Sequence, residues 1–141
     1  MDPVDVKGHL FGSVTRQLLY KSLDANAMRS RAISQNIANA MTPGYERVEV
    51  DFEEQVRRAM KIQVDGTRTN DEHLEIGREA SLKRVNAQTY RPYDPTNPGE
   101  LNNVDIDIEN AKMAENQIQY NFNIEFSGFE KYMAAIKGQT Y

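Results

Sequence analysis

The sequence contains no cysteine and only two histidines among 141 residues. Without cysteine, disulfide bonds and thiolate metal sites are excluded. His9 and His73 have no second candidate ligand at a metal-binding spacing, and both are interpreted as solvated or hydrogen-bonded side chains. We therefore expect no metal and no cofactor.

Long apolar runs are also missing. No stretch approaches the length of a membrane span, and the first eleven residues lack a basic start followed by an apolar block with a cleavage site. We expect no membrane insertion and no cleaved signal peptide. The formal net charge is −4, which argues against nucleic acid as the main partner.

Catalytic motifs are absent from the sequence as well. It has no phosphate-binding glycine loop, no nucleophile elbow, no H-x-x-x-H pair and no cysteine nucleophile. Asp105, Asp107 and Glu109 could in principle hold a hard cation, but the loop around them lacks the twelve-residue calcium spacing. The sequence therefore predicts a protein that is not an enzyme.

The composition is ordinary, but apolar and charged residues are unevenly distributed along the chain. The chain is 39% hydrophobic and 27% charged, as is usual for a soluble protein, but its apolar residues are concentrated toward the two ends. A single compact core is therefore not assured. Residues 1–40 hold five basic and three acidic side chains and residues 101–141 hold three basic and six acidic, so the ends attract each other weakly.

An amphipathic pattern of helical period begins at Leu10 and continues to about Ala40. Its polar members include Ser22, Asn26 and Asn36, which suggest close packing on several faces. A helix of this length must bury its apolar stripe against something distant in sequence. The stripe consists of Leu10, Val14, Leu18, Ala25, Met28 and Ala32, widened by Leu19, Leu23, Ile33 and Ile37.

The helix is expected to stop near Ala40. Pro43 cannot donate a backbone hydrogen bond and pushes Thr42 toward an extended conformation, while Gly44 can adopt the positive φ of a tight turn. Residues 45–52 alternate like a strand or an extended arm. A short helix over 52–60 follows, with Glu53–Arg57 and Glu54–Arg58 pairs at i to i+4 spacing on a solvated face.

Residues 65–103 are rich in turn signals. Asp65-Gly66, Asn70-Asp71 and Asn97-Pro98-Gly99 favour turns, and Gly77 interrupts the run from 74 to 82. We predict an irregular, partly disordered loop over 90–101, with at most short strands or a turn of helix before it. Tyr90 and Tyr93 in this loop could contact a partner, although exposed loop tyrosines are more often incidental.

A second long helix is predicted from about Asp107. Asp105 or Asp107 can cap its first free amides, and acids in the first turn complement the helix dipole. Glu115, Glu125 and Gly128 interrupt its apolar seam, which favours a bundle over a regular two-stranded coiled coil. The seam consists of Ile108, Ala111, Ile118, Phe122, Phe129, Tyr132 and Ile136, flanked by Ala114, Phe126 and Met133.

These patterns predict a mainly α fold. Long N- and C-terminal helices pair antiparallel as an elongated coiled-coil-like bundle, around an irregular, partly extended middle segment. The expected divisions are 1–43, 44–103 and 104–141. Both stripes are wider than a two-helix seam needs, so apolar surface is left over for other subunits. The helix-packing face comprises Leu18, Met28, Ile33, Ile37, Ile118, Phe122, Phe129 and Ile136.

Two motifs carry a resemblance to a known family. Asn36-Ile-Ala-Asn-Ala40 with Thr42-Pro-Gly-Tyr45 and Arg47 resembles the N-terminal signature of bacterial flagellar axial proteins, which form the rod, hook and hook-associated structures. Asn102-Asn-Val-Asp-Ile-Asp107 and the segment from Met113 to Tyr120 resemble the proximal rod proteins of that family. The similarity covers roughly residues 10–60 and 100–136, and the middle segment is too short for a hook-type outer domain.

The resemblance implies a structural subunit of the proximal rod in the flagellar basal body, the hollow drive shaft that transmits torque and lets exported subunits pass. Implied partners are copies of itself, other rod proteins, ring or export-gate components and the type III export apparatus. It also implies a periplasmic location. Its junction residues would be Asn36, Asn39, Thr42, Pro43, Gly44, Tyr45, Asn102, Asn103 and Asp105.

The residues alone leave one alternative open. A small helical adaptor or regulatory protein that binds a partner helix would show the same two amphipathic stripes. Sedimentation distinguishes the two hypotheses, because an adaptor should form a small closed oligomer, whereas a rod subunit should be monomeric when dilute.

Overall fold

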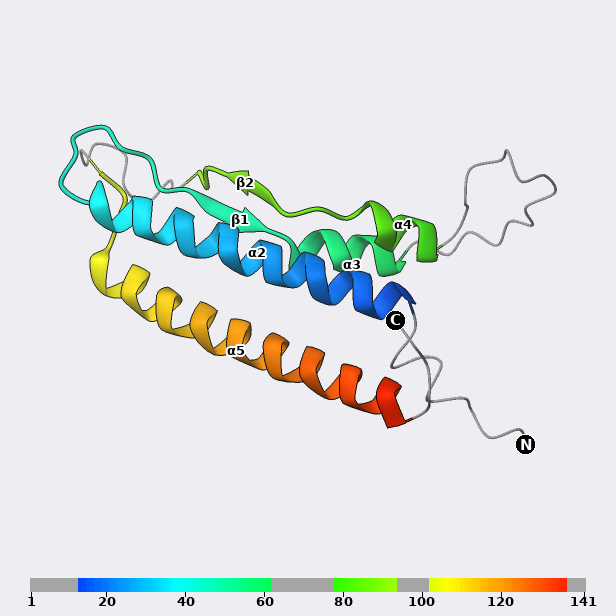
Figure 1. Cartoon of the computed structure of the whole chain (residues 1–141). Coiled ribbons are helices and arrows are strands. Elements are labelled where there is room, and N and C mark those ends of the chain that lie inside the picture. The colour runs from blue at the N-terminus through cyan, green and yellow to red at the C-terminus, as the bar shows by residue number, and fades with distance from the viewer. Residues whose placement is uncertain (1–12, 62–77, 94–101, 137–141) are drawn as a thin grey trace.

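Two long helices lie side by side over most of the length of the molecule (Figure 1). The computed structural model describes residues 13–61, 78–93 and 102–136. The elements within these ranges, in chain order, are α2 (Ser13–Ala38), β1 (Glu49–Asp51), α3 (Glu53–Lys61), α4 (Arg78–Arg84), β2 (Gln88–Tyr90) and α5 (Ile106–Ile136). No helix within these ranges is both long enough and apolar enough to cross a bilayer.

The predicted fold class is confirmed. The protein is mainly helical, and the N-terminal α2 and C-terminal α5 contact each other in opposite directions. α5 begins at Ile106, one residue before its predicted start. The middle segment lies on the far side of α2 from α5 (Figure 1), so α2 is the central element of the molecule.

The bend after α2 follows the predicted local chemistry. α2 ends at Ala38, two residues before the predicted end, and a series of turns continues to Gly44. Gly44 has φ of 75°, the left-handed conformation that favours glycine, as predicted. The chain then extends toward β1, as expected for residues 45–52.

β1 pairs with a strand from the middle segment. It forms an antiparallel two-stranded sheet with β2, in which Glu49 lies opposite Tyr90 and Asp51 opposite Gln88. Tyr90 was predicted to begin an irregular loop, and that boundary is wrong because Tyr90 is the last residue of β2. The short elements expected before the loop are confirmed as α4 and β2. Residues 94–101 of the predicted loop lie outside the described residues.

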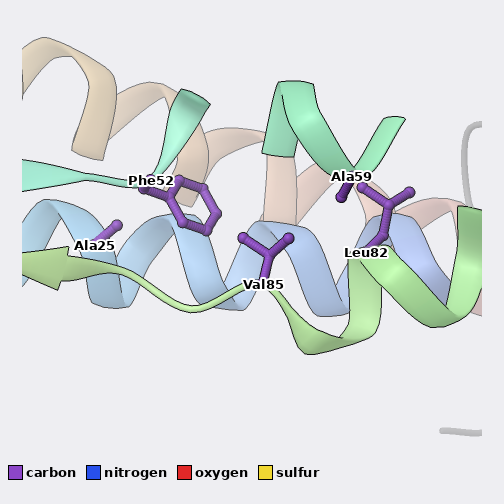
Figure 2. Close-up of a cluster of buried hydrophobic side chains, with 5 residues drawn as sticks. All are labelled: Ala25, Phe52, Ala59, Leu82 and Val85. Atoms are coloured by element: carbon purple, nitrogen blue, oxygen red, sulfur yellow. The ribbon is translucent and has the colours of Figure 1, made fainter. Parts of the chain in front are cut away.

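The hydrophobic core lies between α2 and the middle segment. Ala25 of α2 packs with Phe52, Ala59, Leu82 and Val85, whose side chains converge on one another in Figure 2. This core is small, and the apolar residues of α5 do not take part in it. Phe52, Leu82 and Val85 are few, but tertiary packing gathers them on one face of α2.

Lysine and arginine side chains of α2 fasten the middle segment at both of its helices. Lys21 Nζ donates to the backbone carbonyls of Lys83 and Val85, where α4 ends. Arg29 forms a bidentate contact with Glu53 at 2.7 and 2.8 Å. The predicted Glu53–Arg57 pair is therefore wrong, because Glu53 at the start of α3 reaches α2 instead.

The second pair predicted on α3 is confirmed. Glu54 contacts Arg58 at 3.2 Å and also Arg57 at 2.5 Å. Acids in the first turn of α3 and basic residues in its last turn complement the helix dipole. Other predictions, namely Leu10 of the first stripe, the turns at 65–66, 70–71 and 97–99, and the interruption at Gly77, lie outside the described residues.

Candidate assembly site

Asn36 occupies the point where α2, the extended arm and α5 meet. It is completely buried. Its Nδ2 donates to the Val48 carbonyl at 2.9 Å and to Glu109 Oε2 at 2.8 Å. Its Oδ1 accepts from the Val48 amide at 2.9 Å and from the Tyr45 hydroxyl at 3.0 Å. One side chain therefore ties three segments of the chain together.

Asn102, in the segment that leads into α5, binds the turns at the end of α2. Its Nδ2 donates to the carbonyls of Asn39 and Ala40, both at 2.7 Å, and to that of Thr42 at 3.2 Å. These carbonyls belong to the turns that follow Ala38, where the hydrogen bonds of the helix have ended, and Asn102 supplies them with a donor. The prediction that asparagines satisfy backbone groups near the helix ends is confirmed here.

The remaining residues of the return junction support the start of α5. The Asn103 side chain accepts from the Arg47 amide at 2.8 Å, and Tyr45 forms an isolated parallel bridge with Asn102. Asp105 Oδ1 accepts from the amides of Asp107 and Ile108 at 2.9 and 3.2 Å. Asp105 is thus the N-cap of α5, one of the two capping residues predicted.

Asn39 and Thr42 hold the first side of the bend, and Pro43 and Gly44 form its tip. Asn39 Nδ2 donates to the Gln35 carbonyl at 2.9 Å, and the Thr42 hydroxyl donates to Asn39 Oδ1 at 3.2 Å. Pro43 and Gly44 are exposed. The structure therefore brings the predicted junction residues together at one end of the helix pair.

A charged cluster lies beside Asn36. Lys112 Nζ donates to Glu49 Oε1 at 2.7 Å and to Glu109 Oε1 at 3.2 Å, and Glu109 is 1% exposed. Burial by itself raises the pKa of the Glu49 carboxyl. Hydrogen bonds from Lys112 and Tyr90, with the charges of Lys112 and Arg47, outweigh burial and hold the pKa below its ordinary value. The hydrogen bond to Glu49 in turn raises the pKa of Tyr90.

This cluster predicts a dependence of stability on pH. Because the pKa of Glu49 is lower in the folded chain than in the unfolded one, its carboxylate stabilises the fold above the unfolded value of about 4.3. The contribution is lost as the pH falls through the lowered folded pKa. Urea unfolding should show that Glu49→Gln destabilises the protein at pH 7 and has a smaller effect below about pH 4. An equal loss at both pH values would contradict this.

A polar seam joins α2 to α5 along the rest of their contact. Five cross-helix hydrogen bonds link the two helices at roughly regular intervals, three of them within 3.0 Å. We define the polar seam by these pairs: Asn36–Glu109 (2.8 Å), Ser30–Met113 (3.7 Å), Asn26 carbonyl–Asn116 (3.0 Å), Arg29–Gln119 (3.2 Å) and Ser22–Asn123 (2.8 Å). Asn26 and Asn116 are buried, at 3% and 4% exposure.

The face of α5 predicted to pack on the N-terminal helix does not do so within one chain. Ile118 is 70% exposed, Phe122 66% and Phe129 51%. That part of the prediction is wrong, because α5 meets α2 through the polar seam. No statement is possible for Ile136, whose side chain lies outside the described residues. We call Ile108, Ala111, Ile118, Phe122, Phe129 and Tyr132 the apolar stripe.

The residues of the predicted face that lie on α2 are less exposed than those on α5. Ile33 is 3% exposed, and Leu18 packs against the core while partly exposed. Met28 and Ile37 are half-buried. Among the side chains that the structure describes, every buried hydrophobic one belongs to α2 or to the middle segment. α5 therefore adds only polar residues, Glu109 and Asn116, to the buried set.

The free energies of hydrogen bonding and of apolar burial show that this orientation of α5 is unusual. A hydrogen bond contributes roughly 0.5–1.5 kcal/mol net, whereas full burial of an isoleucine or phenylalanine contributes about 1.5–3 kcal/mol. Burial of the apolar stripe would thus stabilise the chain more than the polar seam does. An apolar groove of about 290 Å³ extends the exposed surface, with Phe122 and Phe126 on one side and Leu18 and Phe52 on the other.

Sequence reasoning missed the α5 half of the polar seam. Glu109, Asn116 and Asn123 follow one another at seven-residue intervals. That spacing places them on one face of a helix and was the available signal. Apolar periodicity alone indicates the neighbouring face, the apolar stripe.

The fold and the site together define a mainly helical protein whose C-terminal helix exposes a large apolar surface. No family model matches the chain. Curated relatives match it, and those named here are flagellar basal body rod proteins FlgB. The protein of Borrelia hermsii is 31% identical over 126 residues, covering 85% of this chain and 93% of the relative. That of Escherichia coli K12 is 32% identical over 111 residues, covering 74% and 78%.

A third relative, from Aeromonas hydrophila, is 30% identical over 121 residues and covers 84% of this chain and 89% of its own length. The chain therefore belongs to the FlgB family of flagellar basal body rod proteins. It is a structural subunit of the proximal rod and not an enzyme, and the resemblance found in its two motifs is confirmed.

Proposed function

We propose that this chain builds the rod by packing the apolar stripe of α5 against neighbouring subunits. The observation that carries the proposal is the exposure of Ile118, Phe122 and Tyr132, at 70%, 66% and 64%. Contiguous apolar surface of this kind on a protein is characteristic of interaction sites. Copies of the same chain and other rod proteins are its partners in a helical, hollow, open-ended assembly.

In this proposal the junction residues set the angle between the helix pair and the extended arm. Asn36 and Asn102 are supported in that role by their hydrogen bonds to both sides of the bend. Pro43 and Gly44 supply the turn, and Thr42 and Asn39 brace it. Residues 1–43 and 104–141 then serve as the core of the subunit, and residues 44–103 serve as its arm.

Ring or export-gate components adjoin the rod at its lower end, and the chain reaches its periplasmic location through the flagellar type III export apparatus. These parts of the proposal rest on the family to which the chain belongs. Membership in the basal body rod family supports the location.

Site-specific photo-crosslinking in intact basal bodies tests the proposed interface. A photoreactive phenylalanine at Phe122 or Tyr132 should form adducts with rod subunits, because both positions are exposed on the apolar stripe. Met60, an apolar residue of α3 that is 56% exposed, is the matched control and should give few adducts. Mass spectrometry of the adducts identifies each partner.

Two results would contradict the proposal. Basal bodies that incorporate the Phe122 probe but yield no adducts would show that the stripe faces no neighbour. Adducts from Met60 alone would place the contact on the α3 side of the molecule.

A further inference from the structure

We infer that the polar residues of α2 in the polar seam, Ser22, Asn26 and Asn36, select which face of α5 packs against α2 and so keep the apolar stripe turned outward. They are specificity-determining residues for the pairing within one chain. The use of the stripe as an assembly surface rests on the proposed function. Which face of α5 packs against α2 is a property of the single chain.

α5 offers α2 two possible faces. One is the apolar stripe, with Ile118 and Phe122, and the other carries Glu109, Asn116 and Asn123. Removal of apolar surface from water is the dominant favourable term in association, so the stripe would be the preferred face on that ground. The structure shows the opposite choice. A feature of α2 must therefore reject the apolar face.

The face of α2 that meets α5 contains the polar groups that can do this. Asn26 is 3% exposed. Its backbone carbonyl accepts from Asn116, and its side-chain Oδ1 accepts from Arg29, which also donates to Gln119 of α5. Ser22 accepts from Asn123, and Asn36 donates to Glu109. If α5 rolled its stripe onto α2, the Ser22 hydroxyl and the Asn36 amide would lose their partners on α5, and the Asn26 side chain would face isoleucine and phenylalanine. Buried polar groups without partners are costly.

The seam also retains polar groups that add no stability. Asn26 Nδ2 and Asn116 Oδ1 are buried without a hydrogen-bond partner, although they belong to residues that meet across the seam. A contact shaped for stability alone would not keep an unpaired donor and an unpaired acceptor. A buried asparagine that lowers stability but selects how helices pair is a well-attested device in coiled coils.

Disulfide formation in the dilute single chain tests the inference, and the absence of native cysteine makes the assay clean. Ser30→Cys with Met113→Cys reports the observed facing, because these two side chains are in contact across the seam. Ser30→Cys with Ala114→Cys reports the rolled facing, because Ala114 is exposed on the stripe side of α5. In the native background the first pair should oxidise about tenfold faster than the second, given the strict geometry of disulfides.

The deciding comparison replaces the polar groups of α2. In Ser22→Leu/Asn26→Leu, α2 becomes apolar where it meets α5, and the ratio of the two oxidation rates should fall to about one or invert. Ala27→Leu/Ser34→Leu adds leucine at exposed positions of the same helix and should keep the native ratio. An unchanged ratio in the folded Ser22→Leu/Asn26→Leu protein would overturn the inference.

A smaller change covers the case in which the double variant does not fold. Asn26→Leu alone is nearly isosteric, and it should lower the ratio by about threefold, with an unchanged ratio rejecting the inference. The ratio of oxidation rates is measured on the single chain. A result that rejects the inference would therefore leave the proposed function standing. A failed photo-crosslink at Phe122 in basal bodies would in turn leave this inference standing.

Discussion

Ile118→Glu/Tyr132→Glu is expected to abolish rod assembly and motility while leaving the isolated chain folded. The two residues are 70% and 64% exposed on the apolar stripe, so the change should alter the free energy of unfolding by less than about 0.5 kcal/mol. In the assembled rod both positions become buried against neighbours in the proposed interface. Each apolar side chain there contributes about 1.5–3 kcal/mol, and an unpaired buried carboxylate costs several more.

The combined loss corresponds to at least about a thousandfold weaker association, since 1.4 kcal/mol is a factor of ten. Motility on soft agar and electron microscopy of basal bodies measure the effect, and thermal unfolding of the purified chain measures its cost to folding. Met60→Glu places the same charge on an exposed apolar position of α3 and is the matched control. Normal motility in the double variant would show that the stripe is not an assembly surface.

Asn36→Leu should give the largest loss of stability of any single change at the junction. Leucine has nearly the same size as asparagine, but it removes all four hydrogen bonds of a side chain with no exposed surface. The Val48 amide and carbonyl and the Glu109 carboxylate then lose a buried partner. Each orphaned group costs about 1–3 kcal/mol, so the total should reach roughly 3–5 kcal/mol.

A loss of that size is large compared with the 5–15 kcal/mol of a typical domain and should lower the melting temperature by roughly 10–20 °C. Circular dichroism during heating measures it. Asn110→Leu makes the same chemical change at an exposed position of α5 and should have little effect. A melting temperature within about 3 °C of the native one for Asn36→Leu would show that the network at the junction is not needed for stability.

Features that depend on a few neighbouring residues were predictable from the sequence. Pro43 and Gly44 define the bend because the proline ring fixes φ and glycine, which has no Cβ, can adopt the positive φ of the turn; both properties hold in any tertiary context. Asp105 caps α5 for a similar reason, since its partners are amides two and three residues away. Two long helices joined through an extended arm could therefore be predicted without a structure.

Features that depend on distant residues could not be read in this way. Phe52, Leu82 and Val85 form the core only because α2 brings them together, and nothing in their own neighbourhoods marks them as core residues. Glu53 is an ordinary helix-surface acid by its spacing, but Arg29, 24 residues earlier, lies within reach. Such pairings can be predicted only when the positions of both partners in space are known.

The sequence by itself determined, to within two residues, where α2 ends and where α5 begins, and also the bend between α2 and the arm and the presence of an apolar stripe on α5. Only the tertiary structure decided which way that stripe faces. Periodicity defines the faces of a helix, but the choice between them depends on what the neighbouring helix presents. Here α2 presents Ser22 and Asn36, whose side chains form hydrogen bonds with the polar face of α5, and the apolar face is left exposed.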